Sequence, residues 1–457
     1  MLRLLSSFVV VLSLDSIVSC DTVATADDLI SLFNNATGNT LQTDIEVTAD
    51  LDFSSSNLRR PLGAFFNGTC VAFSGVFQGN GHSIKGLKMR NKKNLGGYLD
   101  AGLFCSLKNA TVDNLDIDSS CSFIGEWAGA LSVSVNGSLT VTHVMNKASV
   151  CGTDSVGGFI GYVQYFLIYG NCFFFEDCAN NGNVTGSHSS VGGLVGAIDD
   201  QESWGEMVIS NSINNGNVTG DYGVGGFVGA IYSTTHMTNS ISNSTNSGSV
   251  TASDHYAGGF VGVMYELFSS NTITFDFKNS ANKGNVSTTQ GKACGFVCVH
   301  SYNSNIVEIT VKNSINKGSV SAATNGYGIT NIITVAIVVV SMGDVTGPSG
   351  SFTFWDASRY VDLFFGLDGK CINCSDGATL FKHNTNTGFY EVVGTGEHVD
   401  DLLNDEVIKR YFGVTWTKEL ELDLPHIEPF SGGILHSLSM ASIILTLVLT
   451  AFITPSQ

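Results

Sequence analysis

A segment that repeats through the middle of the chain constrains the fold more than any other sequence feature. Its clearest copy is NNGNVTG at residues 214–220, followed by VGGFVGAI at residues 224–231. The valine of the first motif recurs at Val150, Val184, Val218, Val250, Val286 and Val320. Successive valines are therefore 34, 34, 32, 36 and 34 residues apart. A period in this range is typical of solenoids, propellers and other repeat arrays.

Each repeat contains about three strand-like pieces, which favours a solenoid. Around Val218 they are residues 209–213, 216–219 and 226–231. Three short strands fit one coil of a parallel β-helix, and coils stacked about 4.8 Å apart place equivalent residues above one another. The sequence therefore predicts an all-β fold, a right-handed parallel β-helix (β-solenoid) with repeats of about 34 residues.

Both ends of the repeat array are expected to carry caps. Residues 26–33 have an apolar side, and Thr25 or Asp27 could cap the start of a helix there. The sequence therefore predicts a short capping helix over the first coil. The β-helix domain with this cap is expected at residues 21–340. The repeat is then lost, and residues 341–430 are predicted to form an irregular α+β C-terminal cap. The elements expected there are strands at 352–355 and 390–393 and helices at 398–404 and 406–412.

The first residues are typical of a secretory signal. Residues 1–20 combine Arg3 with an apolar run, and small residues precede Asp21. This pattern predicts a cleaved signal peptide, with a buried first strand as the alternative. The mature protein would then enter the secretory pathway.

The last residues are typical of a membrane anchor. Residues 431–457 begin with Ser431, Gly432 and Gly433 and continue into an apolar tail. Small residues before a terminal apolar tail predict attachment of a GPI lipid at one of these three positions. A single membrane span is the alternative, although no Lys or Arg follows the tail. The expected location is the extracellular face of the plasma membrane.

The charge of the chain bears on which kinds of molecule its main body can bind. Charged residues make up 13% of the chain, and the net charge is −19. Such a surface disfavours nucleic acid and anionic lipid as partners of the main body. The same acidity also keeps a long β protein soluble.

The order of motifs resembles GLUG-motif proteins, which are β-solenoid, adhesin-like surface proteins. The resemblance is carried by Phe73-x-Gly75, Gly81-x-x-Ile84, residues 102–104, residues 114–117 and the recurring Gly-Gly-[Leu/Phe/Ile]-[Val/Ile]-Gly. It covers residues 44–333 and implies fold and location more than activity. Similar repeats occur beside bacterial IgA-cleaving metallopeptidases. Cys105 and Cys298 depart from the pattern, because each stands where the family commonly has glycine.

Asparagine is prominent in the repeats and has two interpretations. Asn181, Asn215 and Asn282 are taken as equivalent positions that could form an internal amide ladder. Other asparagines lie in Asn-x-Ser/Thr sequons, which are glycan acceptors when they face outward in a secreted protein. The predicted glycosylation sites are Asn35, Asn67, Asn109, Asn136, Asn183, Asn217, Asn243, Asn285 and Asn373.

The cysteines are expected to form structural disulfides. Removal of Cys20 would leave ten of the 11, an even number suited to an oxidising compartment. Cys371 with Cys374, and Cys172 with Cys178, are the predicted local pairs. Cys294 and Cys298 are expected to stay apart, because an extended strand would hold them about 13 Å from each other.

No sequence motif predicts catalysis, a metal or a cofactor. The chain lacks His-Glu-x-x-His, Gly-x-Ser-x-Gly and the P-loop. Acidic groups at Asp199, Asp200 and Glu202, and at Asp400 and Asp401, are weak candidates for the paired carboxylates of glycosidases.

Two function classes therefore remain. The favoured one is a non-enzymatic cell-surface glycoprotein, adhesin-like or a coat, that displays the solenoid to an extracellular protein or glycan. The alternative is a surface polysaccharide-active enzyme, a lyase or glycosidase. An enzyme should bring carboxylates of adjacent coils together, whereas an adhesin should show a repeated surface.

Overall fold

The computed structural model describes most of the repeat region and short stretches beyond it. The described residues are 20–65, 70–90, 100–165, 171–188, 190–200, 205–233, 238–266, 273–301, 307–312, 314–316, 318–322, 325–327, 339–341, 345–346, 371–372, 378–384 and 389–396. The predicted signal peptide up to residue 19, the lipid-attachment triplet and the predicted C-terminal helices lie outside them. The strand predicted at 390–393 falls within β45.

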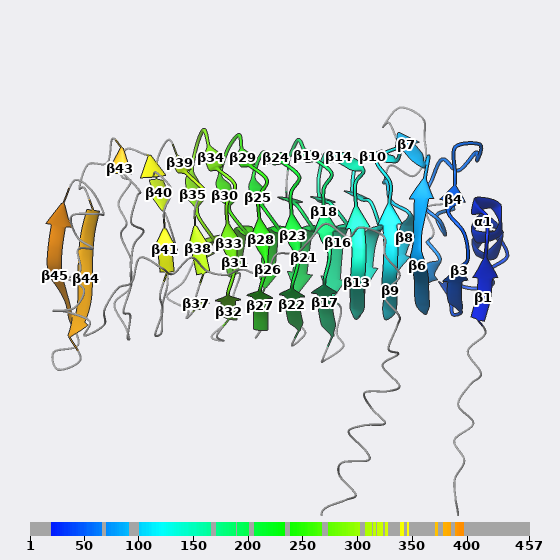
Figure 1. The fold of residues 1–457 in the computed structure, drawn as a ribbon, viewed down its shortest axis with the longest axis horizontal. Coiled ribbons are helices and arrows are strands. Elements are labelled where there is room, and N and C mark those ends of the chain that lie inside the picture. The colour runs from blue at the N-terminus through cyan, green and yellow to red at the C-terminus, as the bar shows by residue number, and fades with distance from the viewer. Residues whose placement is uncertain are drawn as a thin grey trace, which may run out of the picture. The chain divides into compact units, whose positions relative to one another are not determined.

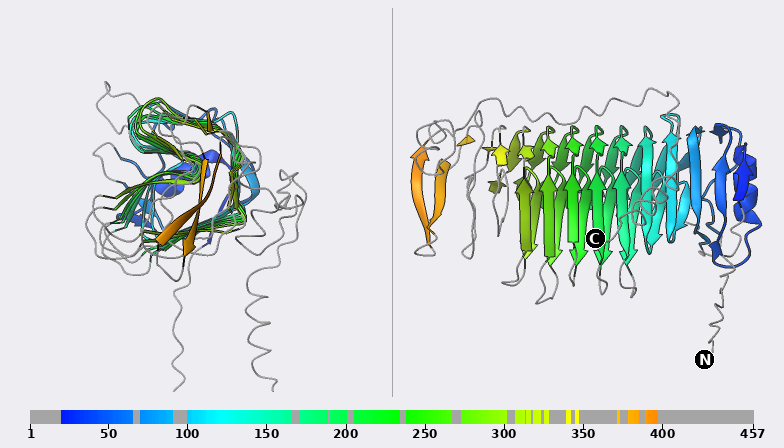
Figure 2. Two further views of the ribbon diagram at one scale, coloured as in Figure 1. Left: turned by 90° about the vertical axis from the view of Figure 1, so that its left-hand side faces the viewer. Right: turned by 60° about the horizontal axis from the view of Figure 1, so that its bottom comes forward.

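The described chain winds through coils of short parallel strands, and equivalent strands of successive coils pair with one another (Figure 1). Seen along the stacking direction, the coils superimpose (Figure 2). Val150 pairs with Val184, Val184 with Val218, and Val218 with Val250, as the period requires. The predicted parallel β-solenoid is confirmed.

The strands form four parallel sheets within the described residues. The 17-stranded sheet contains β1 (Cys20–Val23), β3 (Asp44–Val47), β4 (Leu51–Asp52), β6 (Val76–Lys85), β9 (Ala110–Ile117), β13 (Leu139–Asn146), β17 (Cys172–Glu176), β18 (Ala179–Asn180), β22 (Glu206–Ser210), β23 (Ile213–Asn214), β27 (Thr238–Ser242), β28 (Thr245–Asn246), β32 (Ile273–Lys278), β33 (Ala281–Asn282), β37 (Val307–Lys312), β38 (Ser314–Asn316) and β41 (Val339–Ser341). The ten-stranded sheet contains β7 (Lys88–Arg90), β10 (Ser122–Gly125), β14 (Ser149–Gly152), β19 (Val184–Gly186), β24 (Val218–Gly220), β29 (Val250–Ala252), β34 (Val286–Thr288), β39 (Val320–Ala322), β42 (Val345–Thr346) and β43 (Cys371–Ile372).

Two further parallel sheets complete each coil. The seven-stranded sheet contains β11 (Ala128–Gly129), β15 (Val156–Gly157), β20 (Ser190–Gly192), β25 (Gly223–Gly225), β30 (Tyr256–Gly258), β35 (Lys292–Cys294) and β40 (Asn325–Tyr327). The nine-stranded sheet contains β2 (Thr40–Leu41), β5 (Ala72–Phe73), β8 (Phe104–Leu107), β12 (Ser132–Asn136), β16 (Ile160–Tyr165), β21 (Val195–Asp200), β26 (Val228–Ser233), β31 (Val261–Glu266) and β36 (Val297–Ser301). An antiparallel hairpin joins β44 (Ala378–Asn384) to β45 (Phe389–Gly396).

The predicted N-terminal helix is confirmed as α1 (Ala26–Asn34). Thr25 is its N-cap, and Thr25 and Asp28 form a reciprocal capping box that satisfies donors at the helix start. The helix buries Leu29 and Phe33 against the first coils, and the Phe33 ring lies 5.7 Å from that of Phe104. The apolar end of the stack is thereby covered.

The apolar core runs through the inside of the coils as stacked columns. The repeat valines are almost completely buried, from Val150 to Val320. The phenylalanine after the Gly-Gly pair, or after Cys294-Gly295 in the later coil, forms a second column, in which Phe260 lies 5.0 Å from Phe227 and 5.4 Å from Phe296. Each coil therefore buries its apolar side chains on those of its neighbours.

Buried asparagines of successive coils form an internal ladder. Two of the three positions predicted for this ladder are one residue away from the positions observed. Its members are Asn146, Asn180, Asn214, Asn246, Asn282 and Asn316, each fully buried. The Nδ2 of Asn180 donates to Asn214 Oδ1 at 2.8 Å and also to the carbonyl oxygen two residues ahead. Asn282 was correctly predicted, but Asn181 and Asn215 lie on the exposed side. The cause is strand alternation, because adjacent residues of a strand point to opposite faces.

The predicted strand at 226–231 is in fact divided by a corner. Strand β25 ends at Gly225, and β26 begins at Val228. A Cβ on Gly225 would lie 1.9 Å from Val228 O of β26, and one on Gly229 would lie 2.4 Å from Val191 N of β20. The glycines therefore allow the seven-stranded and nine-stranded sheets to approach each other backbone to backbone.

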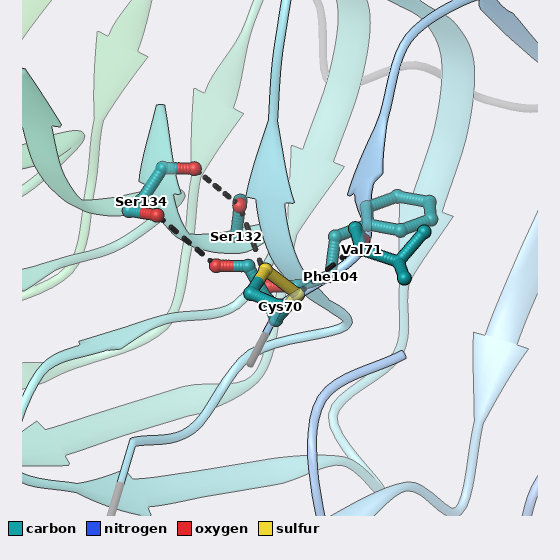
Figure 3. Close-up of a disulfide and its surroundings, with 6 residues drawn as sticks. Cys70, Val71, Phe104, Ser132 and Ser134 are labelled. Atoms are coloured by element: carbon teal, nitrogen blue, oxygen red, sulfur yellow. Dashed lines mark hydrogen bonds between the residues drawn. A yellow bond between two sulfur atoms is a disulfide. The ribbon is translucent and has the colours of Figure 1, made fainter. Parts of the chain in front are cut away.

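Two disulfides form within the described residues, and neither is a predicted pair. Cys70 bonds to Cys105 across 35 positions of sequence (Figure 3). Cys294 bonds to Cys298, with Cα atoms 5.5 Å apart. The prediction that these two stay apart was wrong, because the chain does not run straight between them. It turns between β35 and β36, and β36 pairs with β31 through a register shift at this point.

The predicted pair Cys172–Cys178 is not formed. Cys172 is exposed at the start of β17, whereas Cys178 is a buried thiol that donates to Glu176 O. Between them Asp177 adopts a φ of 51°, which turns the chain and directs Cys178 to the interior. Cys374 of the other predicted pair lies outside the described residues.

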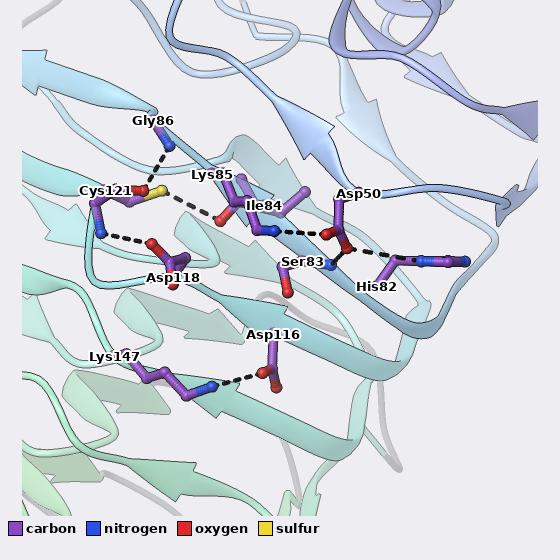
Figure 4. A network of polar contacts seen from close by, with 11 residues as sticks. Asp50, His82, Ser83, Ile84, Lys85, Gly86, Asp116, Asp118, Cys121 and Lys147 are labelled. Atoms are coloured by element: carbon purple, nitrogen blue, oxygen red, sulfur yellow. Dashed lines mark hydrogen bonds and ion pairs between the residues drawn. The ribbon is translucent and has the colours of Figure 1, made fainter. Parts of the chain in front are cut away.

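Exposed ion pairs link adjacent coils near the N-terminal end of the solenoid (Figure 4). Lys85 Nζ lies 2.5 Å from Asp50 Oδ2, and Lys147 Nζ lies 2.7 Å from Asp116 Oδ2. The hydrogen bond from Lys85 lowers the pKa of Asp50. Because these side chains are exposed to solvent, we assign the pairs a minor share of the stability.

Replacing Asn214 with alanine should weaken the solenoid strongly. It leaves Asn180 Nδ2 and Asn246 Oδ1 without their ladder partner, at about 1–3 kcal/mol for each unsatisfied group. The matched control is Asn215→Ala at the adjacent exposed position, which should change the unfolding free energy by less than about 0.5 kcal/mol. Urea unfolding followed by circular dichroism measures both. Equal losses in the two variants would contradict the ladder's role.

Candidate functional site

A seam of aromatic side chains lies where the seven-stranded and nine-stranded sheets approach each other. The sequence places these residues at recurring positions, either just before a strand of the first sheet or inside a strand of either sheet. We define the aromatic seam as Trp127, Tyr162, Tyr222, Tyr232, His255, Tyr256 and Tyr265.

The tyrosines pack most closely at the coils of β26 and β31. Tyr232 and Tyr265 are paired residues of these strands, and their rings stack 5.2 Å apart at an interplanar angle of 3°. Tyr222 and Tyr256 pack against Tyr265 at 6.1 Å each. Burial, together with a hydrogen bond to Tyr222, raises the pKa of Tyr265. This part of the seam is therefore a closely packed cluster of tyrosine rings.

Half-buried rings form the other part of the seam. Trp127 and Tyr162 lie 5.1 Å apart, and each donates a hydrogen bond to a carboxylate. Tyr162 Oη donates to Asp199 Oδ2 at 2.6 Å, and Trp127 Nε1 donates to Asp154 Oδ2 at 3.0 Å. Burial raises the pKa of Tyr162, and the bond to Asp199 adds to the effect. The two rings are thus held in fixed orientations with acceptor oxygens beside them.

Acidic side chains from three successive coils gather next to Trp127. Asp100 comes directly before Ala101, which forms a bridge with Ala128 of β11. Glu126 and Asp154 lie two residues before β11 and β15 of the seven-stranded sheet. Asp100 Oδ1 accepts a hydrogen bond from Trp127 N at 3.0 Å. Burial raises the pKa of Asp100 to about 6, and the charges of Glu126 and Asp154 contribute. Chemically, this group can hold a proton at mildly acidic pH.

Sequence reasoning found only part of this site. Asp199 was predicted as an acidic candidate and does lie at the seam, in contact with Tyr162. Asp200 ends β21, while Glu202, Asp400 and Asp401 lie outside the described residues. Asp100, Glu126 and Asp154 were missed. The signal that could have found them is their recurrence shortly before Ala101, Ala128 and Val156.

In the part of the chain that the structure describes, no group of His, Cys, Asp and Glu side chains could hold a metal ion. Among the same residues, no helix is long and apolar enough to cross a lipid bilayer.

The predicted glycosylation sites fall largely on exposed positions. Asn35, Asn109, Asn136, Asn183, Asn217 and Asn285 are exposed, and Asn243 is half-buried. Asn183 and Asn217 occupy the same place in adjacent coils, and Asn183 Oδ1 accepts from Asn217 N at 3.0 Å. Asn67 and Asn373 lie outside the described residues. Glycosylation itself stays a prediction.

Comparison with known proteins shows no family for this chain. No family model matches the chain, and no curated protein matches it, so the resemblance to GLUG-motif proteins stays an interpretation of the sequence. The chain is similar to a solved structure from Bacteroides ovatus, described as a candidate immunoglobulin A1 protease. The identity is 17%, the TM-score is 0.42, and the alignment covers 81% of this chain and 91% of that one. This similarity implies no shared activity.

The fluorescence of Trp127 should report the protonation of Asp100. In a variant that retains Trp127 while Trp204, Trp355 and Trp416 are replaced by phenylalanine, the emission should titrate with a midpoint near pH 6. Folding raises the pKa of Asp100. The contribution of Asp100 to stability is therefore complete below about pH 4 and is lost as the pH rises through about 6. Asp100→Asn should abolish the transition, and the control Asp118→Asn should leave it unchanged. A midpoint near 4 would refute the assignment.

Proposed function

We propose that this chain is a non-enzymatic, adhesin-like cell-surface glycoprotein that binds an extracellular glycan along the aromatic seam. The observation that carries the proposal is the combination of oriented aromatic rings with carboxylate acceptors at the Trp127–Tyr162 end. Rigid aromatic side chains with a few fixed polar groups are typical of ligand-binding surfaces.

The chemistry of the seam favours a neutral or amino sugar. Aromatic faces cover the apolar faces of sugar rings, and carboxylates accept hydrogen bonds from hydroxyl or ammonium groups. Asp154 and Asp199 are placed beside the rings to do so. Sulfated or sialylated glycans would meet Asp100, Glu126 and a net charge of −19, and are therefore disfavoured.

Two features support an extracellular location. The disulfides Cys70–Cys105 and Cys294–Cys298 suit an oxidising compartment. The sequon asparagines Asn183, Asn217 and Asn285 share one exposed column, where glycans would project from the solenoid. Attached glycans on this column would also fit a shielding coat.

Neutral oligosaccharides should bind to the secreted full chain, and the seam should account for the binding. Tyr162→Ala removes a ring and should weaken binding about tenfold or more, since an aromatic contact contributes about 1–3 kcal/mol. Tyr162→Phe keeps the ring and should weaken it less. The exposed Val76→Ala is the control and should have no effect. A glycan array followed by calorimetry makes the measurement, and binding that survives Tyr162→Ala unchanged would exclude the seam.

A polysaccharide-active enzyme is the second candidate, and one observation favours it. Asp100, with its pKa of about 6, and its neighbours Glu126 and Asp154 come from adjacent coils, as paired catalytic carboxylates would. The two candidates differ in the fate of a bound oligosaccharide. Cleavage that Asp100→Asn abolishes would establish the enzyme, whereas binding without cleavage supports the adhesin.

We also propose that a GPI lipid at Ser431, Gly432 or Gly433 anchors the protein to the plasma membrane. Treating intact cells with a GPI-cleaving phospholipase should release the chain into the medium, because the lipid would be its attachment to the membrane. Mass measurement of the released protein should show loss of the apolar tail. Retention of a protein that still carries residues 434–454 would instead establish a membrane span.

A further inference from the structure

A column of residues with left-handed backbone runs along one outer bend of the 17-stranded sheet. Each coil from β9 to β32 contributes one residue, at the point where its strand bends. With φ angles from 49° to 54°, these residues are Asn114, His143, Asp177, Asn211, Asn243 and Asn279. The strand register places them level with one another. Asparagine suits this backbone conformation well, so His143 and Asp177 are the two departures from the pattern.

Further along the column, one contact between coils is made by two neutral amides. Asn279 Nδ2 donates to Asn243 Oδ1 at 3.0 Å. An amide group neither gains nor loses a proton at physiological pH, so this contact does not depend on pH.

His143 makes its contacts between coils with charged groups instead. Its Nδ1 lies 3.0 Å from Asp113 Oδ1 in the coil before, and its Nε2 lies 3.5 Å from Asp177 Oδ2 in the coil after. Both ring nitrogens can donate only when the imidazole is protonated. A protonated ring therefore spans three coils, whereas a neutral ring can donate to one of the two carboxylates at most.

The charged groups that face the ring are acidic. Asp113 comes from β9, Asp177 follows β17, and Glu176 at the end of β17 adds its charge. The basic side chain of Lys147, just after β13, is paired with Asp116 at 2.7 Å. The proton on His143 therefore supplies a positive charge among three carboxylates.

Other hydrogen bonds hold Asp113 in place. Thr142 Oγ1 donates to Asp113 Oδ1 at 2.6 Å, and Gln78 Nε2 donates to Asp113 Oδ2 at 2.8 Å. Burial by itself would raise the pKa of Asp113, but the hydrogen bonds from His143, Thr142 and Gln78 lower it to about 2. Asp113 is therefore ionised throughout the pH range in which a histidine titrates.

The same contacts act on the protonation of His143. The hydrogen bond with Asp113 raises the pKa of His143 above its ordinary value of 6.5, partial burial opposes this, and the charges of Asp113, Asp177 and Glu176 add to it. Because the folded pKa is higher than the unfolded one, the stabilisation is complete below about pH 6.5 and is lost as the pH rises through the folded pKa.

We propose that His143 is a pH-sensitive link between three coils of the solenoid, with the protonated ring bound to Asp113 on one side and to Asp177 on the other. Loss of the proton leaves the ring able to donate to one neighbouring coil only. The coils that carry Trp127 and Asp100 are then held together less firmly. This link is independent of the proposed glycan, so each proposal can fail while the other stands.

Nuclear magnetic resonance of the secreted full chain, labelled with carbon-13 at histidine Cε1, tests the state of the ring. The chain has ten histidines, and the signal of His143 is the one that disappears in His143→Asn. Its titration midpoint should lie above 6.5 and should decrease in Asp177→Asn, which removes one of the two carboxylates. A midpoint at or below 6.5, or one that Asp177→Asn leaves unchanged, would overturn the proposal.

Urea unfolding at about pH 6 and about pH 8.5 tests the effect on the coils. The urea midpoint should decrease with rising pH more in the wild type than in His143→Asn or Asp177→Asn. Both variants place in the column the residue that the other coils use, and circular dichroism confirms that they are folded. Asp100 is present in every protein compared, so its own titration cancels.

His188→Asn is the matched control, because the ring of His188 is exposed and its Nδ1 contacts the Ser187 hydroxyl rather than a carboxylate. This variant should show the same decrease as the wild type. An equal decrease in the wild type and in His143→Asn would refute the link.

Discussion

The buried asparagine ladder is the interaction on which the solenoid depends. Each amide donates once to the next coil and once to a carbonyl of its own coil, as Asn214 does at 2.8 and 2.9 Å. A buried amide is costly unless it is fully hydrogen-bonded, so a coil displaced by one residue would lose these bonds. The ladder thus sets the register that the valine and phenylalanine columns need in order to stack.

The double glycines connect this register to the candidate site. Because Gly225 and Gly229 carry no side chain, the seven-stranded and nine-stranded sheets come close enough to share a seam. Register then places Tyr232 over Tyr265 and Asp199 beside Tyr232 in successive strands. In the coil of β36 the disulfide Cys294–Cys298 lies in the same small cluster as Tyr256 and Tyr265. The closeness of two backbones therefore decides where aromatic and acidic groups gather.

Much of the fold could be predicted from the sequence, but little of the site. The spacing of the valines predicted parallel coils, and the apolar side of residues 26–33 predicted α1. The ladder was misplaced by one position at Asn181 and Asn215, because the repeat reveals which residues are equivalent without revealing which face they occupy. Asp100 and Trp127 belong to different coils, and their contact depends on the stacking of those coils.

By itself, the sequence determined the repeat length, the β-solenoid and the capping helix, because these follow from local patterns that recur every turn. Only the tertiary structure decided the partners of the cysteines and the position of the aromatic seam. Cys294 and Cys298 meet because the chain turns at a corner, and Cys70 meets Cys105 because two coils stack. Such contacts depend on the path of the backbone in space, which the spacing of residues along a strand does not contain.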